Sequence, residues 1–209
     1  MKLATTAFAD MAPIPAQYAF GRPDPAAHIA LSGNRNPGFQ WSGAPAGTKS
    51  FALICNDPDV PSKPDGVNQE GHVVPRSLPR VDFCHWVLID LPAAATSIAE
   101  GAHSDGVKAR GKPGPAAPDG GRHGVNDYTA WFAGDPAMAG DYYGYDGPCP
   151  PWNDELPHRY EFTLYALDVT TLEVPTRFTC ADVRKAMQGH VLARATVTGR
   201  YTLNPGVSL

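Results

Sequence analysis

The sequence predicts a mostly β fold, an antiparallel β-sandwich with long loops and few helices. Four segments rich in β-branched and aromatic residues have the composition of strands. They are residues 51–57, 83–91, 160–169 and 193–203. Long connections join these segments and helical patterns do not alternate with them, which favours an antiparallel sandwich over a parallel βαβ arrangement.

The composition supports a single domain over residues 1–209. Gly and Pro number 21 and 22, roughly one residue in five, which approaches the range typical of disordered chains. However, 43% of the residues are hydrophobic and 10% are aromatic. The chain therefore has enough apolar side chains to offset the conformational entropy lost on folding, and no linker divides it into two cores.

The N-terminal segment and the segment 83–91 differ in how firmly the sequence predicts their structure. Asp10, Pro13 and Pro15 interrupt the start of the chain before the apolar region of a signal peptide can form, and we expect residues 1–15 to be loosely held. In the segment 83–91, both alternating sets of side chains are largely apolar. This pattern predicts an interior strand that is covered on both faces.

The second half of the chain divides into a long loop and an ordered region. About a third of residues 101–157 are Gly or Pro, which predicts loop, whereas residues 159–203 contain almost none. One helix is predicted in the ordered region, within residues 180–190. Thr179 is its expected N-cap, and Asp182 occupies the capping-box position three residues later.

Charge and cysteine content exclude several classes of protein. The formal net charge is −4 and the 17 Lys and Arg residues are scattered, so no basic surface for nucleic acid is predicted. No apolar run approaches the roughly 18 residues that span a bilayer, which argues against integral membrane association. The cysteines lie at positions 55, 84, 149 and 180 without a CxxC pair. We interpret them as reduced thiols of a cytoplasmic protein; disulfides in a periplasmic protein are the alternative.

Some short motifs lack the context that their chemistry needs. Residues 106–112 match the start of a phosphate-binding P-loop, but Pro113 stands where Ser or Thr must begin a helix. The His-Ser-Asp run at 103–105 cannot form a hydrolytic triad from adjacent residues. His72, His103 and His123 have no metal-ligand spacing and are expected to lie in solvated loops.

Three other segments combine polar residues with rigid backbone. Residues 56–62 (NDPDVPS) follow an apolar run, where Pro58 and Pro61 stiffen the chain. His85 lies inside the apolar strand 83–91, a pattern that by itself is more typical of a hydrogen-bonded core histidine. Residues 147–160 (GPCPPWNDELPHRY) form a Pro-rich turn whose backbone amides could face a ligand at low entropic cost.

Together these segments resemble the phosphatidylethanolamine-binding protein family, and specifically its bacterial Raf kinase inhibitor-like branch. The motifs DPDVP, CHWVLIDLP, GVNDY, YYGYDGPCPPWND and HRYEFTLYALD occur in the family's order and approximate spacing. The flanking QWSGAPAGTKSFALI and AMQGHVLARATVTGRY also resemble that family. The resemblance covers about residues 36–203, which we take as the expected core of the domain.

The resemblance implies a fold and a site. It implies two antiparallel sheets with Greek-key connections, one or two short helices near the C-terminus, and a small anion-accepting pocket at one end. The pocket residues carried over by motif position are Asp57, His85, Gly147, Pro148, His158 and Tyr160. By the same matching, Asp59 and Arg159 resemble a structural ion pair. The segment WNDELP and the long loop 62–82 depart from common family forms beside this pocket.

The chemistry of these residues indicates a binding site that is close to neutral. Two imidazoles, a phenol and backbone amides are donors to phosphate, and Asp57 is expected to raise the pKa of both histidines and to keep one charged. Such a site favours a monoanion or a zwitterion, with phosphate or phosphoethanolamine as the expected ligand type. No cofactor or metal is expected, and a non-catalytic binding protein is favoured over an enzyme.

Three alternatives stay open from the sequence. Asp57, His85 and His158 could serve a hydrolase or a metal-dependent enzyme, with Cys149 either a nucleophile or a packed turn residue. The protein could instead inhibit a kinase or a protease through the loops 62–82 and 101–146. These loops could also form a homodimer interface. Their aromatic residues Trp131, Phe132, Tyr142 and Tyr143 fit packing on their own domain slightly better.

Overall fold

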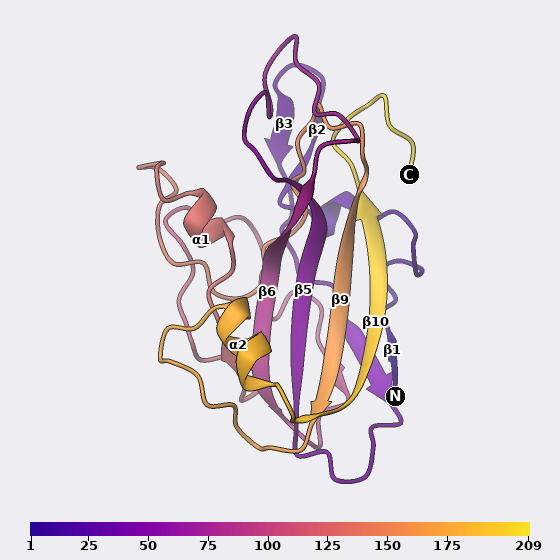
Figure 1. Ribbon diagram of the computed structural model, residues 1–209, viewed down its shortest axis with the longest axis vertical. Coiled ribbons are helices and arrows are strands. Elements are labelled where there is room, and N and C mark those ends of the chain that lie inside the picture. Colours follow the sequence, from indigo (N-terminus) through magenta and orange to yellow (C-terminus); the bar gives the residue numbers. More distant parts are fainter.

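The computed structural model describes all 209 residues. Its main element is a five-stranded antiparallel sheet in the order β10-β9-β5-β6-β8, whose four long strands lie side by side in Figure 1. The strands are β5 (Ser50–Pro61), β6 (Arg80–Pro92), β8 (Arg122–His123), β9 (His158–Leu167) and β10 (Val191–Tyr201). A second sheet, in the order β1-β4-β7, contains β1 (Lys2–Ala4), β4 (Phe39–Ser42) and β7 (Ser97–Ile98).

The core fills the space between the two sheets, and a smaller cluster lies on the outer face of the main sheet. Phe39 and Trp41 of β4 pack with Trp86 of β6 and with other buried side chains of β5 and β9. On the opposite face, Ile54 and Val87 pack against the helix α2 (Cys180–Ala186). Both faces of β6 are therefore buried, and the predicted antiparallel β-sandwich is confirmed.

Helix α2 begins as the sequence predicts. Thr179 is the N-cap: its side chain accepts a hydrogen bond from the backbone N–H of Asp182, and its own N–H donates to the Asp182 carboxylate at 2.8 Å. It is the one helix near the C-terminus. The two other short helices, α1 (Tyr128–Trp131) and η1 (Ala16–Tyr18), lie elsewhere in the chain.

The N-terminal segment is attached to both sheets, which corrects the expectation that residues 1–15 are loose. β1 pairs with β4, and the side chains of Phe8 and Ile14 are buried in the core. The backbone of Ile14 also donates to Arg200 on the edge strand β10, at 2.8 Å. Together, these contacts cover part of an edge strand that would otherwise expose unpaired backbone groups.

The long loop 101–157 is ordered by buried polar residues, and two expectations about it are wrong. His103 and His123 are buried and hydrogen-bonded to each other at 2.9 Å, whereas only His72 is exposed as expected. Lys112 of the P-loop-like motif forms a buried ion pair with Asp146 at 2.9 Å. A loop without regular hydrogen bonds must satisfy its polar groups in this way when it packs against the domain.

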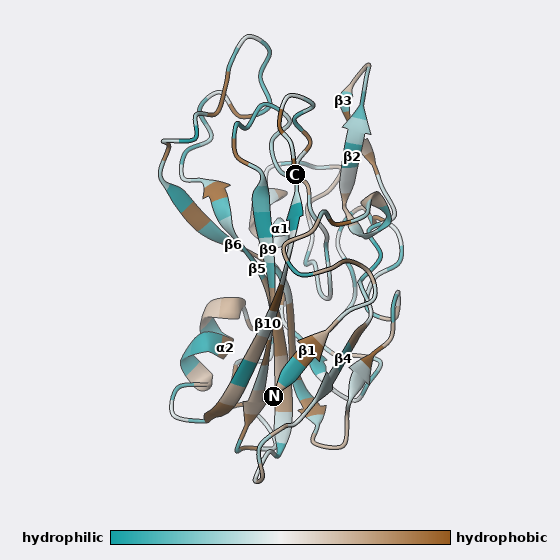
Figure 2. Cartoon of the chain, turned by 90° about the vertical axis from the view of Figure 1, so that its right-hand side faces the viewer, coloured by the Kyte–Doolittle hydropathy of each residue, from teal (hydrophilic) through white to brown (hydrophobic).

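Polar residues gather at one end of the main sheet. Figure 2 shows hydrophilic segments of β6 and β9 toward the end that carries the β2–β3 hairpin, and hydrophobic segments along the opposite half of the sheet. This hairpin consists of β2 (Gly21–Asp24) and β3 (His28–Leu31). It stands beside the loop that joins β5 to β6 (Figure 1).

Candidate functional site

A cavity of about 380 Å³ lies at this polar end of the sheet. Asp57, His85, His158 and Tyr160 all line it. Because β5 runs antiparallel to both β6 and β9, the end of β5 meets the beginnings of its two neighbours. Three segments that are far apart in the sequence therefore place their polar side chains in one cavity.

His158 lies between two carboxylates at the base of the cavity. Its Nδ1 is 2.7 Å from Asp57 Oδ2, and its Nε2 is 3.2 Å from Asp154 Oδ2. Burial by itself would lower the pKa of His158, but the two carboxylates raise this pKa to about 9. Near neutral pH the ring is therefore an imidazolium that donates from both nitrogens to the protein, and it has no hydrogen left for a ligand.

A partly buried arginine, Arg80, extends this set of charges. Arg80 Nη1 lies 2.5 Å and Nη2 3.0 Å from the two oxygens of Asp154. Asp57 and Asp154 are thus balanced by His158 and Arg80. This arrangement supports the near-neutral character expected of the site, although Arg80 and Asp154 were not among the predicted residues.

His85 differs from His158 in its protonation. Its Nδ1 is 2.7 Å from the backbone oxygen of Asp146; because a carbonyl oxygen only accepts hydrogen bonds, Nδ1 carries the hydrogen. Burial lowers the pKa of His85, and the charge of Asp57 opposes this only in part. The ring is therefore neutral near pH 7. The expectation that Asp57 raises the pKa of both histidines is wrong for His85, because desolvation outweighs the carboxylate.

Tyr160 carries an unsatisfied hydroxyl group. Its side chain is fully buried, it lines the cavity, and its oxygen has no hydrogen-bond partner in the protein. Burial raises the pKa of this phenol well above its ordinary value, so the group stays a donor. A buried polar group without a partner costs about 1–3 kcal/mol.

Gly147 and Pro148, two of the predicted ligand-binding residues, are not among the residues that line the cavity. The Gly147 N–H donates to Asn34 Oδ1 at 2.8 Å, and the Pro148 oxygen accepts from the N–H groups of Phe20 and Gly21. The next three residues, Cys149, Pro150 and Pro151, form the wall instead. The motif identifies the correct loop, but only side-chain direction decides which of its residues reach the cavity.

Cys149 is a packed residue of this wall. Burial raises the pKa of its thiol to about 12, so the thiol is protonated near neutral pH and is a poor nucleophile. The backbone N–H of Cys149 forms no hydrogen bond within the protein, whereas the neighbouring prolines have no N–H to offer.

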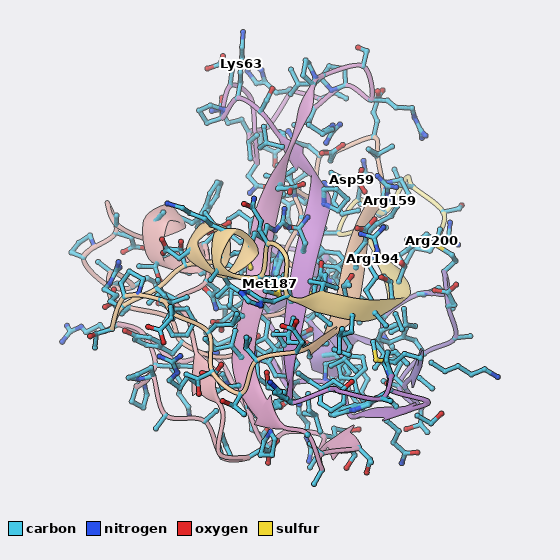
Figure 3. The ribbon with its side chains drawn as sticks, turned by 60° about the horizontal axis from the view of Figure 1, so that its bottom comes forward. Asp59, Lys63, Arg159, Met187, Arg194 and Arg200 are labelled. Atoms are coloured by element: carbon cyan, nitrogen blue, oxygen red, sulfur yellow. The ribbon has the colours of Figure 1, made fainter.

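The predicted ion pair between Asp59 and Arg159 is present. Arg159 Nε and Nη2 lie 2.8 and 2.9 Å from the two carboxylate oxygens, and the Arg159 N–H also donates to Asp59 at 2.9 Å. Figure 3 shows the two residues side by side. The pair joins the end of β5 to the beginning of β9, and so holds together the two strands that carry Asp57 and His158.

Sequence reasoning missed the aromatic wall of the cavity. Phe20, Tyr128 and Phe132 form this wall, and Tyr128 stacks on the other two rings with centroids 4.7 and 5.5 Å apart. The GVNDY motif contained a usable signal, because Tyr128 is its last residue. Nothing local indicated Phe20, which reaches the cavity only through the tertiary fold.

No group of three or more His, Cys, Asp or Glu side chains is arranged so that it could hold a metal ion. None of the helices combines the length and the apolar character needed to cross a membrane.

A β-sandwich with a cavity of mixed polarity at one end of its main sheet defines a class of ligand-binding protein. The family model for the phosphatidylethanolamine-binding protein matches residues 4–202. This chain belongs to that family.

Similar proteins come from bacteria and archaea. A UPF0098 protein of Methanothermobacter thermautotrophicus is 34% identical over 201 residues, covering 96% of this chain and 98% of the relative. The structure of Escherichia coli YbcL, described as a new member of the mammalian PEBP family, matches with a TM-score of 0.68 at 24% identity, over 96% and 97% of the two chains. A homologue from Chlamydia trachomatis matches with a TM-score of 0.61 at 28% identity, over 96% and 95%.

Proposed function

We propose that this protein binds a small phosphate-bearing monoanion or zwitterion in the cavity and does not change it chemically. The observation that carries the proposal is the unused donor of the Tyr160 hydroxyl beside a balanced group of charges. An oxygen of a monoanion can accept a hydrogen bond from this hydroxyl. A highly charged polyanion would lack a compensating cation at the base of the cavity.

A zwitterion such as phosphoethanolamine fits the same groups. Asp57 lines the cavity, and each of its oxygens accepts one hydrogen bond from the protein, from His158 and from the Asp59 N–H at 2.8 Å. A carboxylate has further lone pairs, so Asp57 can also accept from an ammonium group. The neutral His85 ring lines the cavity without a cationic charge that would repel this ammonium group.

The protonation and hydrogen bonding of the histidine and cysteine side chains at the cavity favour binding over hydrolysis. General acid–base catalysis needs a ring nitrogen that can exchange a proton with the substrate. Both nitrogens of His158 are held by carboxylates, and the neutral His85 ring, whose Nδ1 is bound to the Asp146 oxygen, has no activated nucleophile beside it. The Cys149 thiol is protonated near neutral pH. The site therefore offers no activated nucleophile next to a free base.

Calorimetry with phosphate and with phosphoethanolamine tests the proposal. The wild-type protein is compared with Tyr160→Phe, which removes only the unpartnered hydroxyl, and with Tyr165→Phe, which alters a half-buried tyrosine on the same strand. We expect Tyr160→Phe to weaken binding about tenfold or more and Tyr165→Phe to leave it unchanged. Equal affinities in all three proteins, or no binding to the wild type, would contradict the proposal.

Two further parts of the sequence-based hypothesis stay predictions. A regulatory role through protein contacts, of the Raf kinase inhibitor-like kind, depends on the resemblance alone. A cytoplasmic location is supported by four cysteines that are all free thiols in this fold.

A further inference from the structure

We infer that Cys84 and Cys180 form a redox-active dithiol, in which a hydroperoxide oxidises Cys180 and Cys84 then closes a disulfide with it. The two residues lie in the apolar cluster on the outer face of the main sheet, away from the core between the two sheets. The inference assigns a covalent modification site and does not depend on the proposed function.

The two thiols are in contact although they come from distant parts of the chain. Cys84 lies on β6, and Cys180 is the first residue of helix α2, which lies against this sheet in Figure 1. Both side chains belong to the same buried cluster. Their thiol groups hydrogen-bond to each other. A disulfide brings two sulfur atoms to about 2 Å, so these atoms have only a short distance to close.

The strand side of this pair is fixed and the helix side is the one that can move. The Cys84 N–H donates to Asp127 Oδ2 at 2.7 Å, and the Asp127 N–H donates to the Cys84 oxygen at 2.9 Å. Cys180, in contrast, begins a helix of seven residues that follows the irregular segment 168–179. A small shift at the start of this helix can therefore close the bond while β6 stays in place.

The surroundings of Cys180 favour its thiolate. The Arg184 guanidinium, one turn further along α2, hydrogen-bonds to the Cys180 sulfur. Arg184 is itself held by the Asp82 carboxylate at 3.0 Å and by Asn56 Oδ1 at 3.1 Å. The hydrogen bond from Cys84 and the charge of Arg184 lower the pKa of Cys180 below its ordinary value, against the effect of burial. Because the thiolate is the nucleophile, Cys180 is the thiol that reacts first.

The three other thiols lack this combination of charge and access. Burial raises the pKa of Cys55 and of Cys84 well above the ordinary value, and that of Cys149 to about 12. Cys180 is also 7% exposed, whereas Cys84 is 2% and Cys55 0% exposed. A hydroperoxide as small as hydrogen peroxide meets the protein at Cys180, and Cys84 stays a thiol that can resolve the product.

The reaction has two steps, and the peroxide is its only oxidant. The Cys180 thiolate attacks one oxygen of hydrogen peroxide, so that an S–O bond forms, the O–O bond breaks and hydroxide leaves. Cys180 is then a sulfenic acid. The Cys84 sulfur next attacks the Cys180 sulfur, the S–S bond forms and the S–O bond breaks. The proton of the Cys84 thiol joins the leaving hydroxide as water.

Peptide mapping of the peroxide-treated protein tests the inference. The folded wild type is treated with hydrogen peroxide at pH 7, catalase removes the excess, and the remaining thiols are alkylated in urea without reductant. We expect two of the four thiols to disappear, with a disulfide between Cys84 and Cys180 and with Cys55 and Cys149 alkylated. Dithiothreitol should restore all four thiols. Four thiols left after treatment, or a disulfide between any other pair, would overturn the inference.

Substitutions of the two cysteines separate the two steps. In Cys84→Ser, the sulfenic acid on Cys180 has no partner and should be captured by dimedone. In Cys180→Ser, Cys84 should keep its thiol under the same treatment. Dimedone capture at another cysteine, or oxidation of Cys84 in Cys180→Ser, would contradict the assignment. The map of the wild type decides the matter if either variant fails to fold.

A matched pair of arginine variants tests the role of the guanidinium. Arg184→Gln removes the cation that contacts Cys180, and Arg177→Gln removes a half-exposed arginine that pairs with Asp141 instead. Arg184→Gln should slow the loss of the two thiols severalfold, and Arg177→Gln should leave the rate as in the wild type. Equal rates in both variants would show that Arg184 does not activate Cys180 and would overturn that part of the inference.

Discussion

His158 donates a hydrogen bond from Nδ1 to Asp57 across 2.7 Å, although 101 residues separate the two in the sequence. The contact joins β9 to β5 at the base of the cavity, where both side chains are almost completely buried. Asp154 on the other side of the ring makes the histidine a cation between two anions. This arrangement affects both the stability of the protein and the charge that a ligand meets.

The charge on His158 should make stability depend on pH. Its pKa is about 9 in the folded protein against 6.5 for an ordinary histidine. Because the folded pKa is raised, the stabilisation is fully present below pH 6.5 and is lost as the pH rises toward 9. The difference corresponds to about 3 kcal/mol. Urea denaturation of the wild type at pH 6 and pH 9 should show a loss of that order.

His158→Gln provides the control for this prediction. The variant should be less stable at pH 6 because Asp57 loses its buried partner, and its stability should change much less between pH 6 and pH 9. A pH dependence equal to that of the wild type would show that other groups cause it. His190→Gln, at a half-exposed histidine paired with Asp168, should behave as the wild type.

His85 should make anion binding stronger at acidic pH. Burial lowers its pKa, so the ring is neutral at pH 7 and gains a proton only below its ordinary range. The added proton goes to Nε2, because Nδ1 already carries a hydrogen that binds the Asp146 oxygen. Dimethyl phosphate is a suitable ligand because it is a monoanion of constant charge in this range. Its affinity should rise as the pH falls from 7 to 5 in the wild type, and it should stay constant in His85→Gln.

The Cys149 thiol should resist alkylation in the folded protein. Its pKa of about 12 leaves almost no thiolate at pH 8, and alkylation proceeds through the thiolate. Peptide mass spectrometry after iodoacetamide treatment should find Cys149 unmodified under native conditions and modified in urea. Native labelling at the rate of a free cysteine would contradict this description of the wall.

The ion pair between Asp59 and Arg159 should couple the two strands by about 1 kcal/mol. The Arg159 side chain is 46% exposed, so solvent reduces the strength of the pair despite its bidentate geometry. A double-mutant cycle with Asp59→Asn and Arg159→Met measures the coupling. Additive changes in the free energy of unfolding would show that the pair contributes nothing.

The cap of helix α2 offers a test of a purely local prediction. Thr179→Ala removes the side-chain oxygen that accepts from Asp182 and should cost about 1 kcal/mol. Thr176→Ala, in the exposed loop before the helix, should leave the stability within about 0.5 kcal/mol of the wild type. Equal effects of both substitutions would argue against the cap.

The sequence by itself determined the elements that depend on local patterns. The apolar alternation of residues 83–91 predicted a strand buried on both faces, and Thr179 with Asp182 predicted where the last helix begins. The Pro-rich run 147–151 identified the turn that borders the cavity. Backbone preferences and side-chain periodicity of this kind act within a few residues, so they can be inferred without the fold.

Only the tertiary structure decided which groups are free to bind. The same carboxylate, Asp57, lies near two histidines. A second carboxylate keeps His158 protonated, whereas burial keeps His85 neutral. Gly147 faces the interior while Cys149 faces the cavity. Protonation, desolvation and side-chain direction depend on neighbours from distant parts of the chain, such as Asp154, Asp146 and Phe20. The contribution of such neighbours exists only once the strands have paired.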